Sequence, residues 1–140
     1  MNLEKALQIA TDAHHGQYDR YGAPYLLHVV RVMQRGKSEA EQIVGLLHDV
    51  VEDTPLTFDD LRAAGFSEEV VAAVRCLTRP PEESYEAFVE RIKTNRLAVA
   101  VKLNDLEDNM DLRRVPHLTE ADLPRVNKYL KAYHELKKLR

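Results

Sequence analysis

Four side chains that could bind a metal ion or carry a proton lie close together in one apolar stretch, Leu46-Leu47-His48-Asp49-Val50-Val51-Glu52-Asp53-Thr54. At helical spacing, His48 lies one turn from Glu52, and Asp49 lies one turn from Asp53. Burying such charges without partners costs several kcal/mol or more. A bound metal ion would compensate for that cost, so the stretch predicts a metal site.

Two further residues could complete a site around His48 and Asp49. His28 lies one turn into a helix expected after Pro24, and Asp105 directly follows the apolar half of another expected helix. Two imidazoles and two carboxylates form a mixed nitrogen and oxygen shell, which suits manganese, iron or zinc and leaves positions open for water or phosphate. Taken alone, a histidine at the position of His28 is more often a hydrogen-bonded core or rim residue, and Asp105 could be a buried cap partner or half of an ion pair.

The elements that must hold these residues are helical throughout. Apolar residues recur at steps of three and four along most of the chain, and no segment alternates strictly between apolar and polar residues. This pattern is typical of amphipathic helices, and we expect an all-α fold, a single bundle of about seven or eight helices. The expected helices cover residues 2–15, 24–34, 38–53, 57–64, 67–77, 84–93, 96–114 and 121–138.

Short signals mark the ends of these helices. Gly16 suits the end of the first helix, because glycine tolerates the left-handed backbone of a C-cap. Ser38 followed by Glu41 indicates a capping box for the helix that carries His48. The run 97–103 is almost wholly apolar, so its helix should be central and buried.

Length and composition limit the classes of protein that this chain could be. Its 140 residues, 44% hydrophobic and 31% charged, suit one globular domain over residues 1–140. A net charge of −3 supplies no basic field for nucleic acid, and no apolar run approaches membrane-spanning length. The N-terminus resembles no signal peptide, and the single Cys76 excludes an intrachain disulfide. We therefore expect a cytoplasmic protein without nucleic-acid or membrane partners.

Three blocks of sequence carry a resemblance to a known family. They run from Ala13-His14-His15-Gly16-Gln17 to His28, from Leu46 to Thr54, and from Val101-Lys102-Leu103-Asn104-Asp105 to Asn109-Met110. In these blocks the chain resembles the HD-domain metal-dependent phosphohydrolases, and within them the small stand-alone form of the RelA/SpoT-type hydrolases of guanosine 3′-pyrophosphate alarmones. The blocks follow the family's order and, with the C-terminal tail, cover nearly the whole chain.

The resemblance implies a set of roles. One divalent metal ion, usually manganese in this family, would be held by four ligands: His28, His48, Asp49 and Asp105. Glu52 and Asp53 would orient or deprotonate the attacking water, which agrees with their position one turn from a ligand. The implied reaction is hydrolysis, in which a carboxylate takes a proton from water and the metal polarises a phosphoryl oxygen. Attack on the 3′-side phosphorus would release pyrophosphate without a covalent enzyme intermediate.

The resemblance also implies contacts to the substrate. Arg20 would contact phosphates, and Asn109 and Tyr129 would contact sugar or phosphate. The chain departs from the family pattern at two places. Asp19 stands where the first of two adjacent basic residues is usual, and Leu106-Glu107-Asp108 replaces Arg-Leu-His. The periphery is therefore less basic, which bears on the substrate more than on the reaction class.

Three interpretations stay open at this point. The first is a guanosine 3′,5′-bis(pyrophosphate) 3′-pyrophosphohydrolase that only degrades its nucleotide substrate, without the synthetase domain of longer family members. The second is an HD-type hydrolase of another nucleotide or nucleotide-cofactor phosphate, which Asp19 and the changed stretch 106–108 favour. The third is a non-catalytic helical module that binds metal or nucleotide, against which the presence of Glu52 and Asp53 argues. The sequence gives no oligomeric state.

Overall fold

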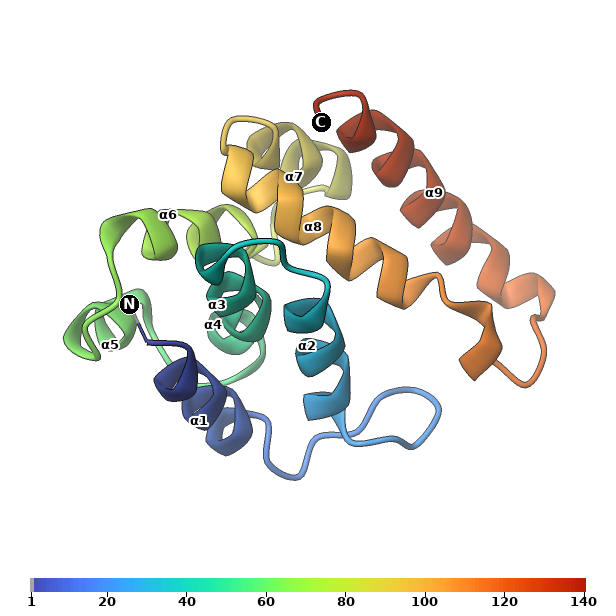
Figure 1. The fold of residues 1–140 in the computed structure, drawn as a ribbon. Coiled ribbons are helices and arrows are strands. Elements are labelled where there is room, and N and C mark those ends of the chain that lie inside the picture. The colour runs from blue at the N-terminus through green and yellow to red at the C-terminus, as the bar shows by residue number, and fades with distance from the viewer. Residues whose placement is uncertain (1) are drawn as a thin grey trace.

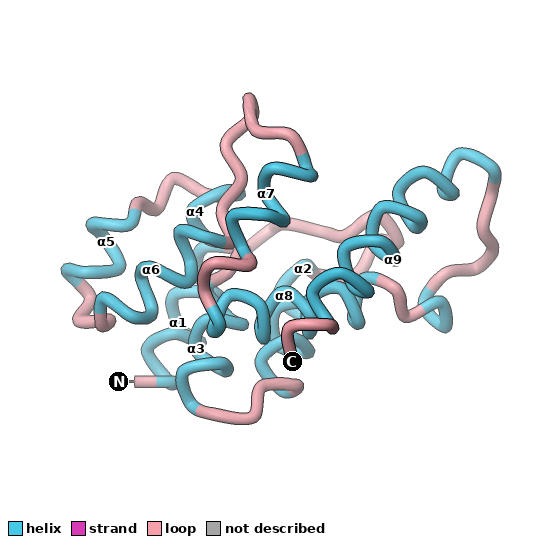
Figure 2. The backbone as a smooth tube through the Cα atoms, turned by 90° about the horizontal axis from the view of Figure 1, so that it is seen from above, coloured by secondary structure: helices cyan, strands magenta, loops and turns pink. Residues whose placement is uncertain are grey.

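The computed structural model describes residues 2–140, which form helices joined by turns and loops (Figure 1). Figure 2 shows helix and loop only, and within residues 2–140 β pairing is limited to one isolated bridge between Tyr18 and Pro24. The expected all-α fold is confirmed. The helices are α1 (Leu3–Ala13), α2 (Tyr25–Gln34), α3 (Glu39–Leu47), α4 (Val50–Asp53), α5 (Phe58–Ala63), α6 (Glu68–Cys76), α7 (Tyr85–Ile92), α8 (Arg96–Asn109) and α9 (Leu123–Lys137), with short 3-10 turns at Leu112–Arg114 and Glu120–Asp122.

Helix α8 is the centre of the fold. It runs across the middle of the molecule between the N-terminal helices and α9 (Figure 1), and it packs against α2, α3, α6, α7 and α9. Every residue from Ala98 to Leu103 is buried, which confirms the predicted central helix. Asp105 and Asp108 on the same helix are buried too. Because buried charges need partners, α8 must meet polar groups from its neighbours.

The helix that was expected to carry His48 is two helices. Helix α3 ends at Leu47 and α4 begins at Val50, so that His48 and Asp49 lie in the turn between them. Nδ1 of His48 donates a hydrogen bond of 2.6 Å to the carbonyl of Gly45. A side chain that takes up a backbone acceptor in this way competes with continuation of the helix. The break therefore coincides with the two residues of strongest chemical interest.

A close approach of α2 and α3 brings the two histidines together. A Cβ atom at Gly45 would lie 3.1 Å from the backbone N and Cα of Met33. Glycine, which has no Cβ, lets the two helices come this near. As a result, the rings of His28 and His48 lie 5.5 Å apart between centroids.

The predicted helix caps are largely present. Ser38 accepts a hydrogen bond of 3.2 Å from the backbone N–H of Glu41, whose own side chain accepts from the N–H of Lys37 instead of completing the capping box. Gly16, just beyond α1, has the left-handed backbone expected of a C-cap, with φ of +79°.

The sequence placed the end of the central helix too late. The helix expected to continue through Arg114 ends at Asn109, and a separate 3-10 turn follows it. The Asp111 side chain accepts from the backbone N–H of Arg113 (3.2 Å) and so caps that turn. The chain thereby changes direction and carries Arg114 back toward the site.

The two longest helices, α8 and α9, have 14 and 15 residues. Spanning a bilayer takes about 20 predominantly apolar residues. None of the helices within residues 2–140 combines that length with that apolar character.

Candidate active site

The four predicted metal ligands converge where α2, the α3–α4 turn and α8 meet. Nε2 of His28 lies 2.9 Å from Oδ1 of Asp105, and Nε2 of His48 lies 3.3 Å from the same oxygen. Oδ2 of Asp49 lies 3.1 Å from Nε2 of His48 and 4.0 Å from Nε2 of His28. The structure thus gathers ligand-type atoms from residues up to 77 positions apart in the sequence.

This donor set fits a divalent cation. Ligand atoms that share one ion at about 2.0–2.2 Å lie roughly 3–4 Å from one another. Donor atoms of His28, His48 and Asp49 all lie within 4.8 Å of one another, and Asp105, which is not part of that group, lies 2.9 and 3.3 Å from the two histidines. Neutral imidazole and carboxylate are also ligands that transition metals accept.

Hydrogen bonds to Nδ1 of each histidine ring turn Nε2 toward Asp49 and Asp105. Nδ1 of His48 donates to the Gly45 carbonyl, and Nδ1 of His28 lies 2.7 Å from Oδ2 of Asp108. Partners of this kind fix the ring orientation and raise the basicity of a metal-binding imidazole. Both rings are therefore held with the same nitrogen turned toward the site.

Two residues that contact the carboxylate ligands were missed by the sequence analysis. The Tyr25 hydroxyl donates to Oδ2 of Asp49, and Nζ of Lys102 donates to Oδ2 of Asp105 over 2.9 Å. Lys102 lies three residues before Asp105 on α8, a spacing at which helical side chains meet, so its contact could have been anticipated. Tyr25 comes from a different helix than Asp49, and no local spacing indicates that pairing.

In the site, nearby charges favour the protonated form of the histidines and the ionised form of Asp49 and Asp105. Burial disfavours the charged imidazole of His48, but Asp49 and Asp105 outweigh burial and hold its pKa well above 6.5. Burial would raise the pKa of Asp49, yet the charge of His48 lowers it to about 2. Burial acts on Asp105 in the same direction, and the ammonium of Lys102 outweighs it and holds the pKa well below 3.8. Without metal, the protein therefore pairs imidazolium groups with carboxylates at this site.

This charge pattern predicts that the stability of the metal-free protein falls with rising pH, whereas the stabilisation gained from bound metal grows with rising pH. The raised pKa of His48 contributes stability that is fully present below about pH 6.5 and is lost as the pH rises through the raised pKa. The lowered pKa of Asp49 contributes stability that is lost only when the pH falls below about 4. Metal binding needs neutral imidazole, so stabilisation by metal grows with pH. We expect the melting temperature in chelator to fall from pH 5.5 to pH 8.0, and the gain on adding manganese to be larger at pH 8.0. A melting temperature in chelator that rises over this interval would contradict the prediction.

Glu52 and Asp53 occupy different places beside the ligands. Glu52 lines the cavity that contains Asp49 and Asp105, and its Oε1 accepts a hydrogen bond of 2.7 Å from the backbone N–H of Arg79. Asp53 is exposed like Glu52, but it does not line that cavity. Partial burial of its carboxyl group, together with the charges of Asp49 and Glu52, raises the pKa of Asp53 to about 6. Of the two acids, Glu52 is therefore the one that faces the cavity with Asp49 and Asp105.

The three residues predicted to contact substrate lie on adjoining cavities. One cavity, of about 190 Å³, is lined by the predicted ligands His48, Asp49 and Asp105, and the next, of about 320 Å³, is lined by Arg20. Tyr25, Asn109 and Tyr129 line both. Nδ2 of Asn109 also donates to Oδ1 of Asp105 over 3.2 Å. The predicted residues are thus brought into one continuous region.

Cations line the cavity that contains the ligands, which the sequence did not indicate. Arg79 and Lys128 face it together with Lys102. Burial, followed by repulsion from Arg79 and Lys102, lowers the pKa of Lys128. A cavity with acids at one wall and cations at another suits an anion that approaches a metal.

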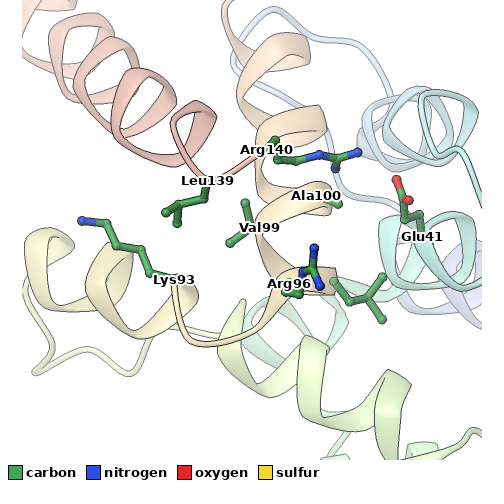
Figure 3. Close-up of a pocket in the computed structure, with 8 residues that line it drawn as sticks. Glu41, Lys93, Arg96, Val99, Ala100, Leu139 and Arg140 are labelled. Atoms are coloured by element: carbon green, nitrogen blue, oxygen red, sulfur yellow. The ribbon is translucent and has the colours of Figure 1, made fainter.

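A larger cavity, of about 590 Å³, lies at the other end of α8 and contains none of the predicted site residues. Figure 3 shows Arg96 at the start of α8, Leu139 and Arg140 after α9, and Glu41 from α3 around it. Its walls are aliphatic and basic and hold no cluster of metal-ligand type within residues 2–140. The candidate active site therefore lies at the smaller, more polar cavities and not at this larger one.

Comparison with known proteins gives relatives that are named as guanosine bis(diphosphate) hydrolases, as GTP diphosphokinases or as both. A guanosine-3′,5′-bis(diphosphate) 3′-pyrophosphohydrolase of Spiroplasma citri is 37% identical over 81 residues, 55% of this chain. The bifunctional (p)ppGpp synthase/hydrolase SpoT of Escherichia coli is 32% identical over 123 residues, 77% of this chain. A putative chloroplastic GTP diphosphokinase of Arabidopsis thaliana is 42% identical over 110 residues, 74% of this chain. These alignments cover 11%, 17% and 12% of the respective relatives, so the chain spans a small part of their length.

A solved structure shares the whole fold. A metazoan orthologue of SpoT that hydrolyses ppGpp superposes with a TM-score of 0.79 at 27% identity, and the match covers 96% of this chain and 84% of that one. No family model matches the chain. The relatives of this kind imply a divalent metal.

Proposed function

We propose that this chain, which belongs to the RelA/SpoT-type family of HD-domain proteins, hydrolyses guanosine 3′,5′-bis(pyrophosphate) and releases pyrophosphate from the 3′ side. One observation carries the proposal: ligand-type atoms of His28, His48 and Asp49 lie within 4.8 Å of one another, and Oδ1 of Asp105 lies 2.9 and 3.3 Å from the two imidazoles, beside a cavity that Glu52 lines. The names of the sequence relatives and of the structural neighbour support the substrate. Residues 1–140 would form one catalytic domain that works in the cytoplasm.

The four ligands would hold a divalent ion, and we propose manganese because the donor set mixes imidazole and carboxylate. A divalent ion supplies Lewis-acid chemistry, which acidifies water and withdraws charge from a phosphoryl oxygen. Glu52, held at one oxygen by the Arg79 N–H, would accept the proton of the attacking water. Asp53, with a pKa of about 6, would serve as a second proton acceptor beside it.

Attack at the 3′-side phosphorus breaks its bond to the 3′ oxygen of the ribose. The products are guanosine 5′-diphosphate, whose 3′ oxygen takes up a proton, and pyrophosphate, which contains the oxygen of the water. Arg79, Lys102 and Lys128 line the cavity where the pyrophosphoryl group would lie, and cations there would compensate the negative charge of that group. No covalent bond to the protein is required.

The nucleoside part would occupy the neighbouring cavity. Arg20 would contact phosphate there, and Asn109 and Tyr129, which line both cavities, would contact sugar or phosphate. The tyrosine rings of this cavity include Tyr18 and Tyr21, flat surfaces on which a purine can stack. A small nucleotide is therefore the proposed partner.

A panel of substrates tests the proposal. Manganese-loaded protein is incubated with guanosine tetra- and pentaphosphate, with deoxynucleoside triphosphates and with nicotinamide dinucleotide phosphate, and the products are resolved by ion-exchange chromatography. We expect the guanosine pyrophosphates to be cleaved with at least about tenfold higher kcat/KM, a difference of about 1.4 kcal/mol. Preference for a deoxynucleotide or dinucleotide would leave the hydrolytic site standing and overturn the substrate, whereas no cleavage of any member would favour a non-catalytic binding module.

A further inference from the structure

The two places where the sequence departs from the family pattern meet on one arginine. Nη2 of Arg114 donates to the backbone carbonyl of Asp108 over 2.6 Å and lies 3.3 Å from its Oδ2. Nη1 of the same guanidinium lies 3.6 Å from Oδ2 of Asp19. One side chain therefore spans from the C-terminal end of α8 to the loop before α2.

The Asp108 end of this link is a fully buried carboxylate with several donors. Besides Arg114, it contacts Nδ1 of His28 at 2.7 Å, Nε of Arg31 at 2.7 Å and Nη1 of Arg35 at 3.1 Å. Burial would raise the pKa of Asp108, but the hydrogen bonds from His28 and Arg31 outweigh it and hold the pKa far below 3.8. A carboxylate on Nδ1 orients a metal-binding imidazole, so Asp108 holds His28 in its position.

The Asp19 end organises the loop that carries Arg20. Oδ1 of Asp19 accepts from the backbone N–H groups of Tyr21 (2.9 Å) and Ala23 (3.0 Å). Its own N–H donates to the Ala23 carbonyl over 2.8 Å, and its carbonyl accepts from Gly22 over 3.1 Å. Gly22 adopts a φ of +86°, which glycine allows because it has no Cβ, and the Asp19 side chain closes the turn around it. Asp19 thus fixes the backbone on both sides of Arg20.

We propose that Arg114 is a positioning residue that couples the metal ligand His28 to the loop of residues 18–24 through Asp108 and Asp19. The two departures are then one linked change: an acid in the loop and an acid on α8 share a cation supplied by the 3-10 turn. Both ends of Arg114 bear on the proposed active site, because His28 faces the metal position and Arg20 lines the neighbouring cavity. The inference rests on the proposed function only for its kinetic readout.

The test compares Arg114→Ala with Arg113→Ala, its neighbour on the same turn. Arg113 pairs only with Asp111 within residues 2–140, and its side chain is 87% exposed, so it is a matched control. For Arg114→Ala we expect about tenfold faster hydrogen exchange at the amides of Tyr21 and Ala23 and about tenfold higher KM, the size that loss of a hydrogen-bonded charge pair gives. Arg113→Ala should change neither by more than about twofold.

The metal end is tested separately by titration with manganese alone. Asp108→Asn keeps an oxygen for His28 and should weaken manganese binding by about 10- to 100-fold. Asp19→Asn combined with Arg114→Ala should raise KM little beyond the single change, because both remove the same contact. Manganese affinity in Asp108→Asn and exchange rates in Arg114→Ala that stay within twofold of the parent would overturn the inference. These two readouts need no substrate, so they stay decisive if the guanosine pyrophosphates are not cleaved.

Discussion

Asp49→Ala is expected to abolish manganese binding in the micromolar range and to lower hydrolysis by about 10³-fold or more. Asp49 supplies one of the two carboxylates that approach both histidines, and it lies 3.1 Å from His48 and 4.0 Å from His28. A metal contributes several kcal/mol of transition-state stabilisation in hydrolysis, and each 1.36 kcal/mol is tenfold in rate. Titration calorimetry with manganese and single-turnover hydrolysis measure the two effects separately.

An exposed aspartate provides the control for that substitution. Among residues 2–140, Asp59 on α5 pairs only with Arg62, and its side chain is 89% exposed, so Asp59→Ala should retain metal binding and rate. Removal of Asp49 also removes a charge that holds the pKa of His48 up, and the thermal unfolding of the chelated variant will report that change. If Asp49→Ala bound manganese as tightly as the parent, the assignment of the metal ligands would be wrong.

Glu52→Gln is expected to keep the metal and lose most turnover. The amide oxygen can still accept from the Arg79 N–H, so the local structure is retained while the capacity to take a proton from water is lost. General-base catalysis contributes about 10²- to 10⁴-fold, and we expect kcat to fall by that factor with manganese affinity within about threefold. Parallel measurement of kcat and of the manganese dissociation constant checks both parts.

Asp53→Asn decides which of the two acids is the principal base. Because Glu52 lines the cavity and Asp53 does not, the loss in Asp53→Asn should be smaller. Glu69 on α6 is exposed, and Glu69→Gln is the control for a neutralised surface acid. A Glu52→Gln protein with full activity beside an inactive Asp53→Asn protein would exchange the two roles.

Local signals in the sequence were sufficient for most of the fold. Apolar periodicity and caps such as Ser38 place the helices, because both depend on residues within one or two turns. The break between α3 and α4 was missed because it depends on the side chain of His48 reaching the Gly45 carbonyl. Periodicity cannot register such a bond, since the apolar pattern continues through the turn.

The site divides in the same way. The residue types of His48 and Asp49 in an apolar stretch were enough to predict a metal site, and the structure brings His28 and Asp105 to them. The groups that support these ligands were not foreseen. Asp108 meets His28 across 80 residues of sequence, and such a pairing is visible only once α2 and α8 are packed together.

The convergence of His28, Asp49 and Asp105 also bears on how long the folded chain survives. An ion at this point would connect α2, the α3–α4 turn and α8. These three elements can bind the ion together only after the central helix α8 has packed against the other two. Interactions formed after the folding transition state slow unfolding more than they speed folding. Protein without metal should therefore unfold and be degraded sooner in the cell, where the abundance of a protein depends on its unfolding rate and on the fraction that is unfolded. Metal supply would then set how much of the protein is present as well as how fast it works.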